Sequence, residues 1–199
     1  MPFVTFSDDY MLDQWGTNHG TYISLHSAYS STGTNELSGG SYARLAITWG
    51  SASGSSKSLT GTPYTLNVPA SSTVAFIGFW DAVSSGNFSG MFPNGGASVY
   101  TFSAPTSTST LLAPGSSYSA NQTVVVFPTA GSVLPTGLTG GTIYYVKSPS
   151  SDSFQLSATN GGSAITLTGD GSGIVQAITA EAYVGAGTFP VSSGSVSLT

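Results

Sequence analysis

Short segments in which apolar and polar residues alternate, separated by glycine, serine and proline, limit most what this chain can fold into. Residues 21–27 (TYISLHS) and 42–50 (YARLAITWG) have the two-residue period of a half-buried strand. Residues 73–82 (TVAFIGFWDA) are apolar on both faces, which predicts a central, buried strand. The pattern predicts an all-β protein, an antiparallel sandwich or barrel.

The composition agrees with a folded β protein. The hydrophobic fraction is 39%, with 10 Tyr, 10 Phe and 3 Trp, which is enough for a core. The charged fraction is 6%, against roughly a quarter in ordinary domains. A disordered chain would lack the aromatic residues, so the low charge does not indicate disorder.

The charge balance excludes several classes of partner. Three Lys and Arg residues against eight Asp and Glu cannot form a basic surface for nucleic acid or for an anionic membrane. The chain has no cysteine, so disulfides and thiolate metal sites are excluded. There is neither a signal peptide nor an apolar run long enough for membrane insertion. We therefore expect a soluble protein, made in the cytoplasm of the cell that produces it.

The N-terminal region predicts one short helix. Ser7 is a suitable N-cap, acidic residues fill the first turn, and Gly16 is expected to end the helix. Tyr10, Met11 and Trp15 contribute to an apolar stripe at helical spacing.

The composition changes after the first 104 residues. Residues 104–121 are rich in Pro, Ser and Thr and predict a connector. Beyond it, short strand-like segments recur with turns every 8 to 12 residues, which is typical of a small β unit. The sequence thus indicates two β units.

Two stretches resemble a family of small virion proteins of tailed bacteriophages, of the tail-fibre, minor structural or head-decoration type. They are residues 22–54, which contain YISLH and NELSGGSYAR, and residues 64–90, which end the buried strand with GFW. The positions that carry the resemblance are Tyr22, Ser24, Leu25, His26, Asn35, Glu36, Ser38, Gly39, Gly40, Tyr42, Ala43, Arg44, Trp49, Gly78 and Trp80.

A second resemblance concerns the later part of the chain. The run AGTFPVSSGSVSL, residues 186–198, is similar to the end of such proteins. Residues 124–176 resemble a β module found in phage fibres, with LPTGLTGGTIYYV followed by SFQLSATNGGSAI. The resemblances imply a discontinuous first domain, residues 1–104 with 182–199, and an inserted, solvent-exposed β module at 105–181.

The resemblance implies a structural, non-catalytic protein on the outside of the virion, without cofactor or metal. The compact size and the lack of a fibrous shaft favour a capsid decoration (minor capsid) protein. The alternatives are a tail fibre or minor tail protein, and a module that binds a host glycan. The expected partners are major capsid or tail subunits and further copies of the chain.

Candidate metal ligands and catalytic residues are few. The acids Asp8, Asp9 and Asp13 could join His19 and His26, but their spacing is that of no known metal site. A structural hydrogen bond is the better interpretation of His26. No G-x-S-x-G motif occurs, so no serine stands out as a nucleophile.

The single arginine, Arg44, is predicted to pair with Glu36, eight residues earlier across a turn. The pair could be an ion pair within the domain or a bridge between subunits, and the former is favoured. Asp81, which follows the buried strand, is interpreted as a turn-starting residue.

Two groups of residues are candidates for binding. Apolar residues near the N-terminus could dock on other virion subunits, because exposed apolar residues at a terminus suggest a partner. They are Phe3, Val4, Phe6, Tyr10, Met11 and Trp15. Aromatic residues of the later segment could contact a ligand such as a glycan. They are Tyr118, Tyr144 and Tyr145, with Phe154 nearby.

Overall fold

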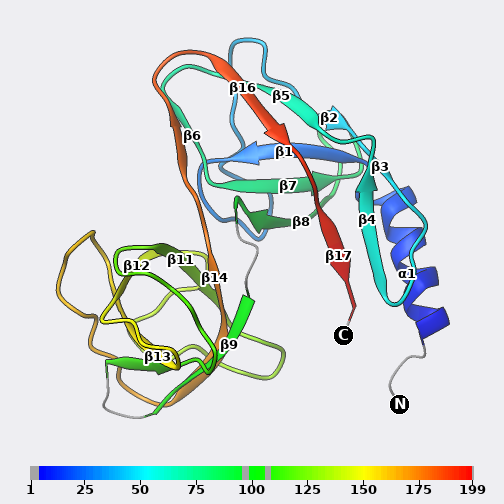
Figure 1. Cartoon of the computed structure of the whole chain (residues 1–199). Helices are drawn as coiled ribbons and strands as arrows, with labels where there is room; N and C mark the ends of the chain where they lie inside the picture. Colours follow the sequence, from blue (N-terminus) through cyan, green and yellow to red (C-terminus); the bar gives the residue numbers. More distant parts are fainter. Residues whose placement is uncertain (1–4, 96–98, 106–108, 199) are drawn as a thin grey trace. The chain divides into compact units, whose positions relative to one another are not determined.

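The computed structural model describes residues 5–95, 99–105 and 109–198. It confirms the predicted fold class, since the chain is mostly β with one helix, antiparallel sheets and a closed barrel of six strands (Figure 1). The chain divides into two compact units, Met1–Phe92 with Ala180–Thr199 (unit 1) and Pro93–Thr179 (unit 2). Each unit is described separately.

The helix α1 is longer than predicted and spans Thr5–Asn18. It begins before Ser7 and continues through Gly16, so both predicted ends are wrong. Gly16 lies against Lys57, and a Cβ atom there would come within 2.5 Å of the Lys57 Cε atom. The glycine therefore permits close packing rather than ending the helix. The last turn closes with the His19 and Gly20 amides donating to the Trp15 carbonyl.

Unit 1 is centred on a four-stranded sheet in the order β2-β1-β7-β8. The strands are β1 (Tyr22–His26), β2 (Leu45–Ala46), β7 (Phe76–Trp80) and β8 (Phe88–Pro93). Strand β7 is an inner strand, as its two apolar faces predict. It pairs antiparallel with β1, with Ser24 opposite Gly78 and Tyr22 opposite Trp80. This register brings polar residues of β1 to the side chain of Trp80.

Three smaller sheets join the two separate segments of unit 1. The early strands are β3 (Thr48–Trp49), β4 (Ser56–Thr60), β5 (Tyr64–Val68) and β6 (Ser72–Val74). The late strands are β15 (Glu181–Tyr183), β16 (Gly187–Val191) and β17 (Ser195–Ser197). They pair antiparallel as β15 with β6, β16 with β5 and β17 with β4, and β4 also pairs with β3 (Figure 1).

An aromatic cluster helps to join the helix to the sheet in unit 1. The Trp15 ring lies edge-on to Trp49 and Phe79, with centroid distances of 5.3 and 5.7 Å. Leu12 is also buried, so the inward face of α1 follows the helical spacing of Leu12 and Trp15. The core of the unit contains residues of both chain segments, including Ile23 and Phe189.

Unit 2 is a closed antiparallel barrel in the order β10-β13-β12-β11-β14-β9, with β9 pairing back to β10. Its strands are β9 (Val99–Ala104), β10 (Thr110–Leu112), β11 (Thr123–Phe127), β12 (Ile143–Lys147), β13 (Ser153–Ser157) and β14 (Gly171–Ala177). Alternate residues fill the interior. In β12, Tyr144 and Val146 are buried and their neighbours are only partly covered.

The boundary between the units differs from the predicted one. Strand β9 was expected to belong to the first domain, but it forms a long ladder with β14 of the barrel, from Val99 to Ala104. Unit 2 therefore begins at Pro93, not at 105, and ends at Thr179. Its two ends lie side by side, because the Thr179 amide donates to the Asn94 carbonyl (2.7 Å) and Asn94 Nδ2 donates to the Thr179 carbonyl (2.9 Å).

Candidate functional site

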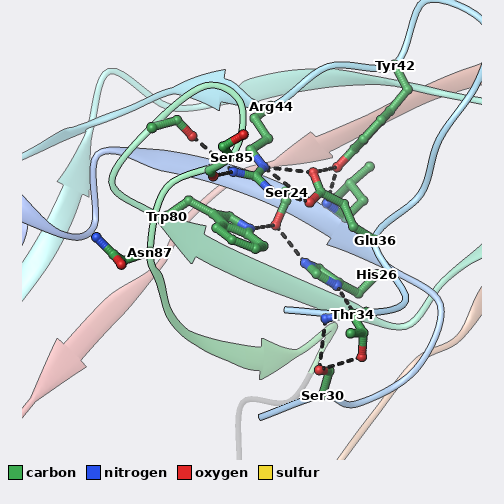
Figure 2. Close-up of polar contacts among 12 residues, drawn as sticks. Ser24, His26, Ser30, Thr34, Glu36, Tyr42, Arg44, Trp80, Ser85 and Asn87 are labelled. Carbon is green, nitrogen blue, oxygen red and sulfur yellow. Dashed lines mark hydrogen bonds and ion pairs between the residues drawn. The ribbon is translucent and has the colours of Figure 1, made fainter. Parts of the chain in front are cut away.

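A buried chain of hydrogen bonds crosses the main sheet of unit 1. Trp80 Nε1 lies 2.9 Å from Ser24 Oγ, which lies 2.7 Å from His26 Nε2 (Figure 2). On the other side of the imidazole, His26 Nδ1 lies 3.0 Å from the carbonyl oxygen of Thr34. Ser24 and His26 are fully buried. These hydrogen bonds thus link β7, β1 and the segment that follows β1.

The direction of each of these hydrogen bonds follows from its partners. The Thr34 carbonyl can only accept, so His26 Nδ1 carries the proton. The Trp80 indole can only donate, so Ser24 Oγ accepts from it and gives its own proton to His26 Nε2. All these groups are satisfied when the imidazole is neutral. His26 thus makes a structural hydrogen bond, as its place in the sequence suggested.

Burial lowers the pKa of His26 below its usual value of 6.5. The bond to the Thr34 carbonyl and the charge of Glu36 raise the pKa, while the charge of Arg44 lowers it, but these effects are smaller than that of burial. Ser24 and His26 have the types and spacing of a nucleophile and its base. Neither side chain reaches solvent, however, so the pair offers no place for a substrate.

An ion pair lies next to this chain of hydrogen bonds. Arg44 Nε is 2.9 Å from Glu36 Oε1, and Arg44 Nη2 is 2.7 Å from Glu36 Oε2, so the contact is bidentate. The exposed fractions of the two side chains are 9% and 19%. The Tyr42 hydroxyl donates to Glu36 Oε1 (3.1 Å) and accepts from the Leu25 amide (2.9 Å). The structure thus brings Glu36 and Arg44 together within unit 1.

Arg44 also holds an exposed loop, residues 81–87. Its Nη1 atom donates to the carbonyl oxygens of Ala82 (3.1 Å) and Ser85 (2.7 Å). The guanidinium lies over the Trp80 ring, 3.4 Å from the ring centroid (Figure 2). The Arg44 side chain therefore binds the Glu36 carboxylate, stacks on the Trp80 ring and holds the 81–87 loop.

The carboxylate of Asp81 closes the same loop. It accepts from the Asn87 amide and from Asn87 Nδ2, both at 2.7 Å. These bonds lower the pKa of Asp81. Asp81 is thus a turn residue, as its position after the strand suggested.

The helix acids bind the hairpin before β4, not a group of histidines. Asp13 accepts from the Ala52 amide (2.9 Å) and contacts the Lys57 ammonium. Asp9 Oδ1 accepts from the Ser55 amide (2.8 Å), and Asp8 accepts from the Ser55 hydroxyl. Over the ranges that the structure describes, no three His, Asp or Glu side chains gather as metal ligands.

The six candidate docking residues do not form one surface. Phe3 and Val4 lie outside the described residues, and only the backbone of Phe6 is described, within α1. Tyr10 and Met11 are exposed, by 61% and 38%. Trp15 was expected beside them, but it packs into the core of unit 1 against Trp49 and Phe79, so this assignment is wrong.

Two of the three candidate ligand-binding tyrosines are buried, which contradicts the prediction. Tyr118 packs edge-on against Phe154 inside the barrel, and its hydroxyl donates to the Val175 carbonyl (3.1 Å). Tyr144 is 4% exposed and its hydroxyl accepts from the Thr139 amide. Tyr145 is partly covered on the outer side of β12. Alternation required one of the adjacent pair to face inward, but it could not show which.

Several members of the network were found only in the structure. Ser24, Tyr42 and Trp80 were noted as positions of resemblance, without a role. The bond from Trp80 to Ser24 joins residues that are 56 positions apart and depends on the register of β1 and β7. The signal that could have found it is the Y-x-S-L-H alternation, which puts the polar Ser24 and His26 on one face of a strand that is otherwise apolar.

The fold and this network define a β-rich unit organised around a buried polar cluster, and comparison with known families points to its class. Residues 13–95 match the family described as "Podophage GP4 fiber I protein gp80". The match covers less than half of the chain, but it includes every residue of the network. It supports a phage fibre-type protein and gives no support to capsid decoration.

No curated protein and no solved structure matches the chain. The family match stops near the start of unit 2, so the resemblance of the barrel to a phage fibre module remains an expectation. In the part of the chain that the structure describes, α1 is too short to cross a membrane.

Proposed function

We propose that this protein is a structural component of a tailed-phage virion, part of or attached to a tail fibre. The observation that carries the proposal is the match of residues 13–95 to a podophage fibre protein family. The Ser24, His26, Glu36, Arg44 and Trp80 network lies inside the matched range.

The buried position of this network favours a non-catalytic role. The chain's best candidate for a nucleophile and base, Ser24 and His26, is enclosed and fully used by structural hydrogen bonds. The acids of α1 hold a hairpin, and Asp81 closes a turn. These groups maintain the shape of unit 1, which suits a protein whose task is to be a stable part of a particle.

The partners that we propose are other virion subunits and further copies of this chain. The low charge argues against nucleic acid, because only three cationic side chains are present and two of them are engaged with carboxylates. A glycan-binding role loses its main support, since Tyr118 and Tyr144 are buried in the barrel.

Imaging of purified virions tests the proposal. Antibodies raised against the recombinant full chain, carrying gold, would be located by electron microscopy, and mass spectrometry would verify the protein in the same particles. We expect label at the tail or its fibres. Label spread over the head would favour capsid decoration instead. Particles that lack the protein by both methods would contradict a virion role.

A further inference from the structure

The neutral form of His26 fits its surroundings, and the space around the ring is closed. Both ring nitrogens have partners, Ser24 and Thr34. Across the sheet, a Cβ atom at Gly78 would lie 2.5 Å from His26 Nε2 and 2.6 Å from Ser24 Oγ. A larger side chain at this position would collide with both groups, so a glycine faces the pair.

Protonation would break this arrangement at one atom. The imidazolium has N–H donors at both nitrogens. Its Nδ1–H can still donate to Thr34, but the new proton on Nε2 would face the Ser24 hydroxyl. Ser24 already accepts from Trp80, and its own proton would lose its acceptor. A buried donor without a partner is unfavourable.

The charged and titratable groups around His26 offer little to stabilise the imidazolium. Glu36 favours the charged ring and Arg44 disfavours it. The Glu36 carboxylate is already bound by Arg44 through two nitrogens and by the Tyr42 hydroxyl. Strand β8 presents the aromatic ring of Phe88, 6.0 Å from the imidazole.

The segment after β1, residues 27–36, covers the outer side of this site. Thr34 binds the ring, and the Ser30 hydroxyl accepts from the Thr34 amide (2.9 Å). Gly33 packs against Trp80, where a Cβ atom would lie 2.4 Å from the indole ring. Movement of this segment would let a charged His26 ring reach water.

We propose that His26 is an acid-sensitive latch that holds residues 27–36 on the β1–β7 sheet when neutral and releases them when protonated. The burial of His26 lowers its pKa in the folded protein below the unfolded value of 6.5. The unfolded chain therefore takes up the proton first as the pH falls. The contribution of His26 to stability is present above about pH 6.5 and is lost as the pH falls towards the folded pKa.

The distribution of residues makes the latch measurable in the full-length protein. Both histidines and all three tryptophans lie in unit 1, at positions 19, 26, 15, 49 and 80. Tryptophan fluorescence during urea unfolding therefore reports on unit 1, and histidine titration cannot act within unit 2. Between pH 7.5 and 5.5, one buried histidine with an unfolded pKa of 6.5 lowers the folded-to-unfolded ratio by at most about tenfold in total.

The first test compares urea unfolding at pH 7.5 and 5.5 for three proteins. Wild type and His19→Gln, the control at an exposed histidine, should both lose stability on acidification. His26→Gln should be less stable than wild type at pH 7.5. Its free energy of unfolding should also change much less between pH 7.5 and pH 5.5 than that of wild type. An equal pH dependence in His26→Gln and wild type would overturn the proposal.

The second test uses NMR on the wild-type chain, so it does not depend on the folding of His26→Gln. His19→Gln assigns the two histidine signals. The His26 ring should show a proton on Nδ1 at pH 7.5 and should titrate below 6.5. The protection factors of the amides of Ser27 and Thr34 should fall as His26 titrates. If the ring titrates while both amides stay protected, the latch is wrong.

Discussion

At the scale of single residues, unit 1 depends on polar side chains that have several partners each. Arg44 binds Glu36 through two nitrogens, stacks on Trp80 and donates to two carbonyl oxygens of the 81–87 loop. The planar guanidinium makes all these contacts at once, which the ammonium of a lysine cannot do. In a chain with 6% charged residues, the one arginine is used inside the fold.

We therefore expect Arg44→Lys to destabilise unit 1 by about 2–3 kcal/mol, because it keeps the charge but loses the bidentate and stacking contacts. Urea unfolding followed by tryptophan fluorescence measures the change. In a double-mutant cycle with Glu36→Gln, the effects should differ from additivity by more than about 0.5 kcal/mol. Combination with Val184→Ala, at a residue that is 90% exposed, should be additive. Additive effects in both cycles would contradict the energetic importance of the pair.

The pairing of Glu36 with Arg44 could be expected from sequence, since an isolated arginine eight residues after a glutamate has few other partners. The burial of Tyr118 could not, because Tyr118 lies outside the strands, where alternation gives no direction. Helical spacing placed Trp15 in one apolar stripe with Tyr10 and Met11, but it could not show that Trp15 packs inward while the other two side chains are exposed. The role of Gly16 could not be predicted either, because the side chain that approaches it, Lys57, comes from a hairpin far along the chain.

At the scale of elements, unit 1 is assembled from strands at both ends of the chain. Strands β15, β16 and β17 pair with β6, β5 and β4, so the late segment completes three of its sheets. Phe189 and Val191 of β16 are buried in the same core as residues of β1. Folding of unit 1 thus requires contacts across the whole length of the barrel insertion.

Phe189→Ala should destabilise unit 1 by about 3–5 kcal/mol, because it removes a buried aromatic ring and leaves a cavity. Val184→Ala, in the same late segment but 90% exposed, is the matched control and should change stability by less than about 0.5 kcal/mol. Tryptophan-monitored urea unfolding compares the two. Similar small effects would show that β16 contributes little to the core of unit 1.

The strands themselves were easier to predict than their partners. The period of two identified several segments, including β1 and β12, and the continuous apolar run identified β7. The period of two could not place β9, because an exposed face and a buried face look alike in a strand of either unit. Only the ladder between β9 and β14 assigns that strand to the barrel. The helix was recognised, but it continues through Gly16 to Asn18, beyond its predicted end.

At the scale of the whole molecule, the chain contains two units with separate hydrophobic cores. One core lies inside the barrel and includes Leu111, Val126 and Phe154. The other lies in unit 1 and is completed by the late strands. Because the barrel begins and ends at neighbouring residues, Asn94 and Thr179, its removal should leave the two segments of unit 1 free to pair.

Joining Phe92 to Ala180 through a short Gly/Ser linker should give a folded unit 1 that unfolds cooperatively. Tryptophan fluorescence and the His26 ring signals should match those of the full chain, because these residues all lie outside the deleted part. Residues 93–179 alone should fold as a barrel with tyrosine emission only. A deletion variant that aggregates would show that the two units share stabilising contacts.

The neighbouring ends of the barrel have a consequence for how such a chain can change over time and in the laboratory. Asn94 and Thr179, next to the two ends of the barrel, are joined by two hydrogen bonds, so a segment that replaced the barrel would have to span only the short distance between them. A compact domain whose termini lie equally close together should therefore be accepted at this insertion site in place of the barrel. The same pair of hydrogen bonds thus marks a site for displaying foreign domains and for exchanging whole domains during evolution.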